Sequence, residues 1–407
     1  MVGIEKEHNM KIKQLFIEGF RSLKNVVWEP GDLNVLIGPN GSGKSNLLRA
    51  LELVSISAQG GLGKHVQAAG GMQSLVWDGE AAEIAVKVKT TPPEPERKEE
   101  TDSLTYDFHL TRIGQTSAYR IERELLGNFY RVEIKDKTEP FKFLERKGQK
   151  GVVFSETQRR LDAAPELMTE EETLLSMISG PFFENRVITL FQKELAGWSV
   201  YHDLRVDNRA PLRQPAITRP ERRVSPDGQN LISVMHTLYT SDRKFKKDIN
   251  AAMKAAFGND FEELAFAPAT DQKIQLQVRW KSLKREQSAA DLSDGTLRFL
   301  FLLTVLASPT PAPVIAIDEP EVGLHPGMLP IVAEHAVDAS LRSQVILTTH
   351  SPQFLDAFRD TVPTTTVTKW EDGQTELKTL EGKDLEYWLK EYTLGSLFKS
   401  GELEGMR

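Results

Sequence analysis

The N-terminal part of the chain alternates apolar and polar residues with the period of β-strands. Residues 11–20, KIKQLFIEGF, alternate as a strand with one buried face does, and LNVLIG (33–38) is a short, mostly apolar strand. The proline-rich, charged stretch TPPEPERKEET is typical of a solvated hairpin loop. We therefore predict an antiparallel sheet, to which further β-rich segments contribute near residues 83–90, 104–112, 119–125 and 130–134.

The C-terminal part changes to an alternation of helical and strand patterns. Helical patterns cover residues 231–238, 245–257 and 297–306, and a helix follows Pro326. The strands KIQLQVRW, PVIAID and QVILTTH lie among them. This alternation favours an α/β fold with a mostly parallel sheet, an antiparallel β-subdomain and an inserted helical or lid region. No sustained heptad series is present, so we expect no long coiled coil.

A glycine-rich turn joins the apolar strand at 33–38 to a helical stretch that begins near Ser42. Its sequence, GPNGSGKSN, has the P-loop spacing GxxxxGK followed by Ser or Thr. Glycines allow backbone turns that point successive N–H groups at an anion, and the helix N-terminus adds partial positive charge. The pattern predicts that Lys44 binds the β- and γ-phosphates of a nucleotide and that the Ser45 hydroxyl ligates magnesium.

Two carboxylates follow the apolar strand PVIAID. Asp318 ends the run, and Glu319 comes one residue later. A carboxylate at the C-terminal end of a strand beside a P-loop holds magnesium through water, as in the Walker B arrangement. The next carboxylate is placed to orient and deprotonate an attacking water. We therefore expect Asp318 to serve the metal and Glu319 to act as the base.

Two further short motifs suit a γ-phosphate. Ser293, Asp294 and Gly295, in ADLSDGTLRF, stand at a helix start, where Ser293 is expected to be the N-cap. A small Ser-x-Gly turn at a positive helix end also suits a phosphate. TTHSP puts His350 directly after a strand, where an imidazole is placed to donate to the γ-phosphate.

These motifs, in this order, resemble those of ABC-type ATPase heads. Within that class, FIEGFRSLKNV, LSDGTLRFL, IDEPEVGLHP and ILTTHSP resemble the SMC/RecF branch. They are most similar to the short AAA-21 type ATPases related to OLD-family nucleases, without the nuclease module. The resemblance covers most of the chain at the level of motif order. It implies a P-loop ABC-type ATPase head that uses ATP and Mg²⁺.

The resemblance also implies roles for individual residues. It assigns catalysis to Lys44, Glu319 and His350, and the metal to Ser45 and Asp318. Ser293, Asp294 and Gly295 would form the signature motif of such heads, which reads LSGGQ. Here Asp294 replaces its first glycine and Thr296 replaces its glutamine. No Q-loop glutamine is identified in this sequence. Residues 322–326 would form the D-loop. The residues implied to bind the nucleotide are Gly38, Pro39, Asn40, Gly41, Ser42, Gly43, Lys44, Ser45, Asn46, Ser293, Asp294 and Gly295.

In such heads the signature of one subunit completes the ATP site of another, which implies a head-to-tail homodimer or a higher even oligomer. We expect an ATP-driven switch that acts on DNA or on a separate effector protein such as a nuclease, in anti-phage defence or DNA repair. We expect no nuclease activity from this chain itself. Two alternatives are the nucleotide-binding subunit of a membrane transporter and a nucleotide-dependent scaffold with negligible turnover.

The motifs divide the chain into four predicted parts. Residues 10–135 form an N-terminal lobe with Walker A and the antiparallel β-subdomain, and residues 136–260 form the inserted helical or lid region. Residues 261–380 form a C-terminal lobe with the signature, Walker B and His350, which corresponds to the switch histidine of such heads. Residues 381–407 form a C-terminal helical tail.

Composition narrows the class of protein and of partner. The absence of cysteine excludes disulfides, iron–sulfur clusters and thiolate zinc sites. The longest apolar run is far shorter than the ~20 residues that span a bilayer, so we expect a soluble, cytoplasmic protein with no membrane partner. A net charge of −7 means that nucleic acid must bind a local basic face. The candidate is an arginine-rich, proline-broken segment with Arg205, Arg209, Arg213, Arg219, Arg222 and Arg223; alternatively, these arginines pair with Asp203, Asp207 and Glu221.

Overall fold

The chain folds into two compact units, which we describe separately. The computed structural model describes residues 10–91, 101–114, 116–130, 141–154, 160–163, 168–178, 185–358, 361–380 and 393–402. Unit 1 comprises Met1–Gly31, Gly38–Trp198 and Thr366–Thr379. Unit 2 comprises Asp32–Ile37, Ser199–Thr365 and Leu380–Arg407. The four-part division of the sequence stays a prediction.

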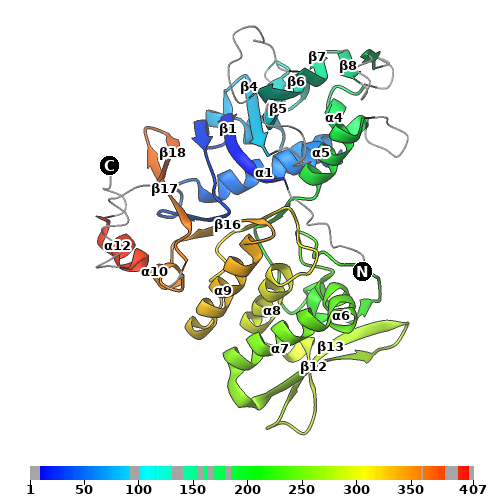
Figure 1. Cartoon of the computed structure of the whole chain (residues 1–407), viewed down its shortest axis with the longest axis vertical. Coiled ribbons are helices and arrows are strands. Elements are labelled where there is room, and N and C mark those ends of the chain that lie inside the picture. The colour runs from blue at the N-terminus through cyan, green and yellow to red at the C-terminus, as the bar shows by residue number, and fades with distance from the viewer. Residues whose placement is uncertain are drawn as a thin grey trace. The chain divides into compact units, whose positions relative to one another are not determined.

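An antiparallel sheet of eight strands forms much of unit 1 (Figure 1). Its order is β2-β1-β4-β5-β6-β7-β8-β9. The predicted antiparallel sheet is thus confirmed, while residues 131–134 and most of the proline-rich loop lie outside the described residues. The strands are β1 (Ile12–Phe20), β2 (Leu23–Trp28), β4 (Glu83–Thr90), β5 (Thr101–Arg112), β6 (Tyr119–Tyr130), β7 (Phe141–Lys147), β8 (Lys150–Phe154) and β9 (Arg160–Asp162).

The first strand shows why the sequence pattern predicts this sheet. Leu15 and Ile17 are fully buried on one face of β1, while Phe16 is half-buried and Glu18 is exposed on the other. Each buried side chain of this size stabilises the fold by about 1.5–3 kcal/mol relative to an exposed one. The alternation therefore determines which face of the strand turns toward the core.

Among the helices of unit 1, α1 (Lys44–Gln59) packs against α5 (Arg186–Ala196) (Figure 1). The helix starts two residues later than the predicted Ser42, because Gly43 has a φ of 101° and cannot be helical. The glycine-rich residues 60–71 contain a further short helix that the sequence pattern did not suggest. The shorter helices are α2 (Leu62–Ala68), α3 (Met72–Leu75), α4 (Leu174–Met177) and the 3₁₀ turn η1 (Trp77–Gly79).

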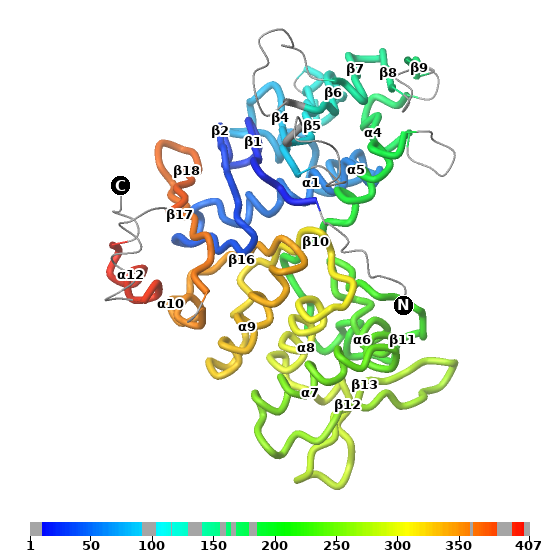
Figure 2. The backbone as a smooth tube through the Cα atoms, viewed as in Figure 1, coloured from blue at the N-terminus to red at the C-terminus, as the bar shows by residue number. Residues whose placement is uncertain are grey.

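A hairpin from near the C-terminus also belongs to unit 1. Strands β17 (Thr364–Glu371) and β18 (Gln374–Thr379) form it, and β18 lies beside β2 (Figure 2). The backbone N–H of Thr375 donates to the Ser22 carbonyl at 2.8 Å. This contact brings residues that lie 353 positions apart in the sequence next to each other.

Unit 2 contains the predicted strands LNVLIG, PVIAID and QVILTTH in a parallel arrangement, together with a short fourth strand that the sequence pattern did not suggest. In the order β10-β15-β16-β3 they are β10 (Ser199–Tyr201), β15 (Val314–Ile317), β16 (Gln344–Thr349) and β3 (Leu33–Ile37). Every residue of these four strands is buried, as expected for parallel strands that are covered on both faces. Ile317 pairs with Leu347, and Thr349 pairs with Ile37. The C-terminal ends of β15, β16 and β3 therefore lie at one edge of the sheet.

Helices and a small antiparallel sheet complete unit 2 (Figure 1). Helix α9 (Leu329–Ser340) packs on β3 and β16, and α8 (Asp294–Leu306) packs on α9. Most of the predicted C-terminal helical tail lies outside the described residues. The remaining elements are α6 (Leu231–Ser241), α7 (Arg243–Phe257), α10 (Pro352–Leu355), α12 (Leu394–Ser400), β11 (Ala216–Ile217), β12 (Phe261–Pro268), β13 (Lys273–Trp280), β14 (Gln287–Ser288) and the 3₁₀ turns η3 (Pro211–Arg213), η4 (Gly258–Asp260), η5 (Ala289–Asp291) and η6 (Pro326–Met328).

Candidate functional site

The predicted P-loop follows β3 in the chain and leads into α1. Gly38 and Gly43 have positive φ angles of 152° and 101°. A Cβ atom on Gly38 would lie 2.3 Å from the Thr368 carbonyl oxygen, and one on Gly43 would lie 1.9 Å from the Thr375 hydroxyl. Both positions therefore require glycine for conformation and for space. The hairpin β17–β18 forms the wall that excludes a side chain there.

The side chains of the P-loop contact the backbone of the loop and the β17–β18 hairpin. The Lys44 ammonium is buried and donates to the carbonyls of Gly38 at 2.8 Å and Pro39 at 3.0 Å. The hydroxyls of Ser42 and Thr368 lie 2.5 Å apart. Pro39, Asn40 and Gly41 form the exposed tip of the loop. The Lys44 ammonium is thus held by the backbone at the start of the loop.

The N-terminus of α1 fits an anion. Among the described residues, no side chain caps this helix end, and its first turn contains no acidic residue. A helix of 16 residues carries about half a positive charge at this end. Ser45 lies in the first turn, whereas the Asn46 amide donates to the Ser22 hydroxyl at 2.7 Å and thereby braces the loop. The loop, the ammonium and the helix end together suit a phosphate chain.

The predicted Walker B residues follow β15 in unit 2. The Thr348 hydroxyl donates to Oδ1 of Asp318 and accepts from the backbone N–H of Glu319 at 3.0 Å. Nδ1 of His202 lies 3.7 Å from Oδ2 of Asp318. Glu319 has a φ of 46°, an uncommon conformation for a residue with a side chain. Thr348 therefore fixes both acidic residues from the neighbouring strand.

The predicted switch histidine lies beside the predicted base. Nδ1 of His350 is 3.0 Å from Oε1 of Glu319 and 4.0 Å from Oε1 of Glu321. Glu321 accepts from the Thr349 hydroxyl, and its side chain is only 8% exposed; this desolvation raises the pKa of its carboxyl above the ordinary value. Asp318, Glu319 and His350 are thus gathered at the C-terminal ends of two adjacent parallel strands.

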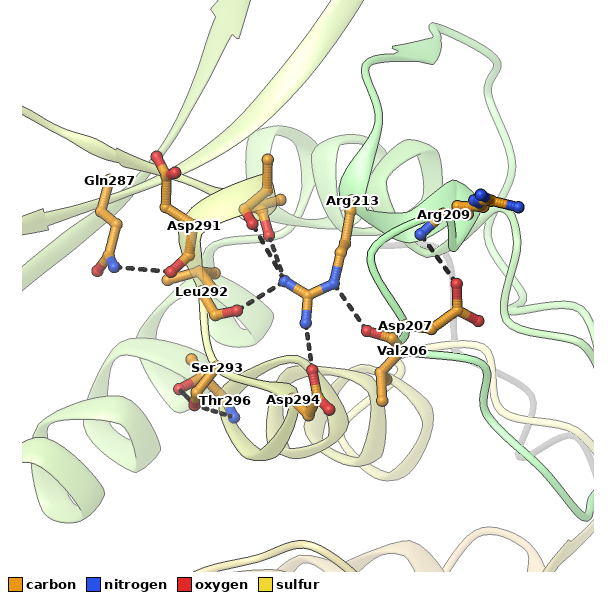
Figure 3. Close-up of polar contacts among 12 residues, drawn as sticks. Val206, Asp207, Arg209, Arg213, Gln287, Asp291, Leu292, Ser293, Asp294 and Thr296 are labelled. Carbon is orange, nitrogen blue, oxygen red and sulfur yellow. Dashed lines mark hydrogen bonds and ion pairs between the residues drawn. The ribbon is translucent and has the colours of Figure 1, made fainter.

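The predicted signature begins α8. The Ser293 hydroxyl accepts from the Thr296 N–H at 3.2 Å, which confirms the predicted N-cap (Figure 3). A Cβ atom on Gly295 would lie 2.5 Å from the Gly323 carbonyl oxygen in the predicted D-loop. Gly295 therefore allows the D-loop backbone to approach the helix closely.

The family match covers the four parallel strands and the P-loop, signature, Walker B and TTHSP motifs. Residues 33–356 match the family model AAA_21, described as "AAA domain, putative AbiEii toxin, Type IV TA system". The chain belongs to the AAA_21 family. This agrees with the resemblance inferred from the motifs. Membership of the family identifies the chain as an ATPase of AAA type. No curated protein matches the sequence.

Solved structures show the fold of this AAA_21 protein. An Smc head bound to the C-winged helix domain of ScpA matches at 16% identity and a TM-score of 0.55, covering 92% of this chain and 99% of that one. A Pyrococcus furiosus Smc head bound to the C-terminal domain of ScpA matches at 14% identity and 0.53, covering 94% and 99%. A Pyrococcus yayanosii Smc head matches at 13% and 0.51, covering 97% and 100%. The predicted SMC-like ATPase head is confirmed as a fold.

The arginine-rich segment of the AAA_21 chain differs in part from expectation. Arg213 is only 4% exposed, so it cannot belong to an exposed basic face. Arg205 pairs with Asp207 at 3.2 Å and Arg219 approaches Glu221 at 4.0 Å, as the alternative interpretation expects. No helix among the described residues is long and apolar enough to cross a membrane.

The structure adds residues to the site that the sequence interpretation missed. Thr348 and Thr349 stand beside His350 in the sequence, so their position in TTHSP was an available signal. Glu321 is part of the same acidic run as Glu319. Thr368 and Thr375 carry no local signal at all, because only the folded hairpin brings them to the P-loop.

Proposed function

We propose that this AAA_21 chain binds and hydrolyses ATP and that this cycle drives a switch in a partner. One observation carries the proposal. Asp318, Glu319 and His350 lie at the C-terminal ends of β15 and β16, and β3, whose end Ile37 pairs with Thr349, continues in the chain into the P-loop. Ligands of open parallel sheets bind at such carboxyl ends.

In this proposal, residues 38–46 bind the phosphates. The Lys44 ammonium exchanges the carbonyls of Gly38 and Pro39 for phosphate oxygens, which are stronger acceptors because they are charged. Backbone N–H groups of the loop and of the α1 N-terminus add donors. Ser45 and Asp318 would hold magnesium, which supplies positive charge to the phosphate oxygens when bound.

Hydrolysis needs a base at the attacking water, and Glu319 is assigned that role. As the water oxygen bonds to the γ-phosphorus, the bond to the β–γ bridging oxygen breaks, and the water proton passes to the Glu319 carboxylate. Thr348 fixes the backbone of Glu319, and His350 contacts its carboxylate. His350 would donate to the γ-phosphate and, through its contact with Glu319, link the presence of that phosphate to the base.

We further propose that two chains close head to tail around ATP, with Ser293, Asp294 and Gly295 of one chain completing the site of the other. Ser293 and Asp294 are both exposed, which supports a surface role for this motif. Two of the similar Smc heads are bound to ScpA domains, which supports a protein partner here. The ATP cycle would act on DNA or on a separate effector protein such as a nuclease, in defence or repair, and the chain itself would not cut DNA.

Phosphate release and light scattering test the proposal on the purified chain. Wild type should release phosphate from ATP with magnesium, and Glu319→Gln should form a dimer that depends on ATP. Plasmid DNA in the same reaction should stay intact. A Glu319→Gln protein that stays monomeric at saturating ATP would contradict the closure, and cleavage that persists in this variant would contradict the absence of nuclease activity.

A further inference from the structure

A buried arginine lies directly behind the signature. Arg213 belongs to η3, 80 residues before Ser293 in the chain, yet its guanidinium reaches the start of α8 (Figure 3). Nε donates to the Val206 carbonyl at 2.7 Å, and Nη1 donates to the Leu292 carbonyl at 2.7 Å. Nη2 donates to Oδ1 of Asp294.

The same guanidinium also holds the turn before the helix. Nη1 lies 3.3 Å from the carbonyl oxygens of both Ala289 and Ala290 in η5. The residues on either side of Ser293, Leu292 and Asp294, are therefore bound to one rigid, planar group. The Ser293 hydroxyl contacts the Thr296 hydroxyl and accepts from the Thr296 N–H. The position of the Ser293 hydroxyl thus depends on Arg213 through its two neighbours.

Arginine suits this place for two physical reasons. Its fork presents five N–H donors in a fixed plane, whereas a lysine ammonium is a single point on a flexible chain. A buried cation also needs a counter-charge, and the carboxylate that faces it is Asp294. This pairing offsets the negative charge of Asp294, which would otherwise repel a γ-phosphate. It also gives a reason why aspartate stands where LSGGQ has glycine.

We propose that Arg213 is a positioning residue of the signature, which acts through Leu292 and Asp294 to hold Ser293 for the ATP of the opposite chain. The inference rests on the proposed head-to-tail closure. Asp294 is then a partner of Arg213 and not a phosphate ligand. This proposal replaces the expectation that Asp294 contacts the nucleotide, and it gives a role to the buried Arg213 within a segment expected to be exposed.

Substitutions separate positioning from nucleotide binding. Arg213→Met and Arg213→Lys should both keep the wild-type Kd of the single chain for ATP and lower kcat by about ten- to a hundredfold, because small displacements at a reacting site are costly. Asp294→Asn keeps an acceptor oxygen and should retain more activity than Asp294→Ala. Arg285→Met is the matched control, since Arg285 is 80% exposed and pairs with Asp291 just before the signature. It should behave as wild type.

Mixing variants tests whether the defect lies in the signature. Lys44→Ala chains, which have an intact signature, are mixed with Arg213→Met chains, which have an intact P-loop. The mixed dimer contains one complete site, so ATP hydrolysis should return above the level of either variant alone. If Arg213→Met does not fold, Asp294→Ala takes its place in the same mixture. A mixture of Lys44→Ala with Ser293→Ala tests the closure itself.

The two mixtures distinguish the positioning role of Arg213 from the head-to-tail closure. Recovery in both mixtures supports Arg213 as a positioning residue. Recovery with Ser293→Ala but not with the Arg213 or Asp294 variant overturns the role of Arg213 and leaves the closure in place. No recovery in either mixture overturns both. Full kcat in Arg213→Lys would also overturn the inference, because a point charge cannot replace the fork.

Discussion

Nδ1 of His350 lies 3.0 Å from Oε1 of Glu319, so the proposed switch histidine and the proposed base contact each other directly. They follow β16 and β15, which are neighbours in the parallel sheet. The contact joins the side chain that follows one strand to the side chain that follows the other. In the proposed mechanism, His350 therefore orients the carboxylate of the base before a phosphate is bound.

Replacement of His350 tests this relationship. We expect His350→Ala to lower kcat by about ten- to a hundredfold, because the carboxylate loses the group that orients it. The Kd for ATP should change little, since the P-loop supplies most of the phosphate contacts. Phosphate release and fluorescent-nucleotide titration measure the two quantities. Loss of binding equal to the loss of turnover would contradict the assignment.

Lys44 and Glu319 should separate binding from turnover. Lys44→Ala should weaken ATP binding by about ten- to a hundredfold or more, because a charge-assisted contact to the ground-state phosphates is lost. Glu319→Gln should bind ATP as wild type does and lose about a hundred- to ten-thousandfold in kcat, because glutamine cannot accept the proton of the water. Equal loss of binding in the two variants would refute these roles.

A buried carboxylate in unit 1 should matter for stability. Glu124 accepts from Tyr106 Oη at 3.0 Å and from the N–H groups of Leu174 and Leu175. In Glu124→Gln an amide NH₂ would face one of these donors, so we expect the free energy of unfolding to fall by about 1–3 kcal/mol. Urea unfolding followed by circular dichroism measures it.

Glu122→Gln is the control for this prediction. Glu122 lies on the same strand, pairs with Arg120 and is 46% exposed. Its substitution should change the free energy of unfolding by about 0.5 kcal/mol or less. Similar effects of the two substitutions would mean that the buried contacts of Glu124 do not stabilise unit 1.

A histidine on β5 should make stability depend on pH. The hydrogen bond with Asp107, at 3.1 Å, raises the pKa of His109 above its ordinary value of 6.5, and burial opposes this only in part. The charged form is thus favoured in the folded chain. Its stabilising effect is fully present below pH 6.5 and is lost as the pH rises through the folded pKa.

Comparison with His109→Gln isolates this contribution. The free energy of unfolding of wild type should exceed that of the variant most at low pH, and the difference should shrink steadily toward high pH. Urea unfolding from about pH 5.5 to about pH 9 covers the window that the raised pKa defines. A difference that stays constant across this range would show that the pair makes no charged contribution.

The sequence by itself determined the features that depend on local spacing and on the chemistry of single residues. The P-loop could be predicted because only glycine tolerates positive φ at Gly38 and Gly43, and a fixed spacing then sets Lys44 before the helix. The Ser293 cap could be predicted because the acceptor and the N–H that it binds are three residues apart. The parallel strands could be predicted because burial on both faces leaves continuous apolar runs.

Only the tertiary structure decided which distant residues meet. Arg213 looked like part of an exposed basic segment, because its sequence neighbours are prolines and arginines; the fold buries it against carbonyls more than 75 residues away. Thr368 and Thr375 line the P-loop from a hairpin more than 300 residues further along the chain. The contact of His350 with Glu319 depends on the register of two strands. Such contacts have no local sequence signal, because they result from how the elements pack and not from the residues beside them.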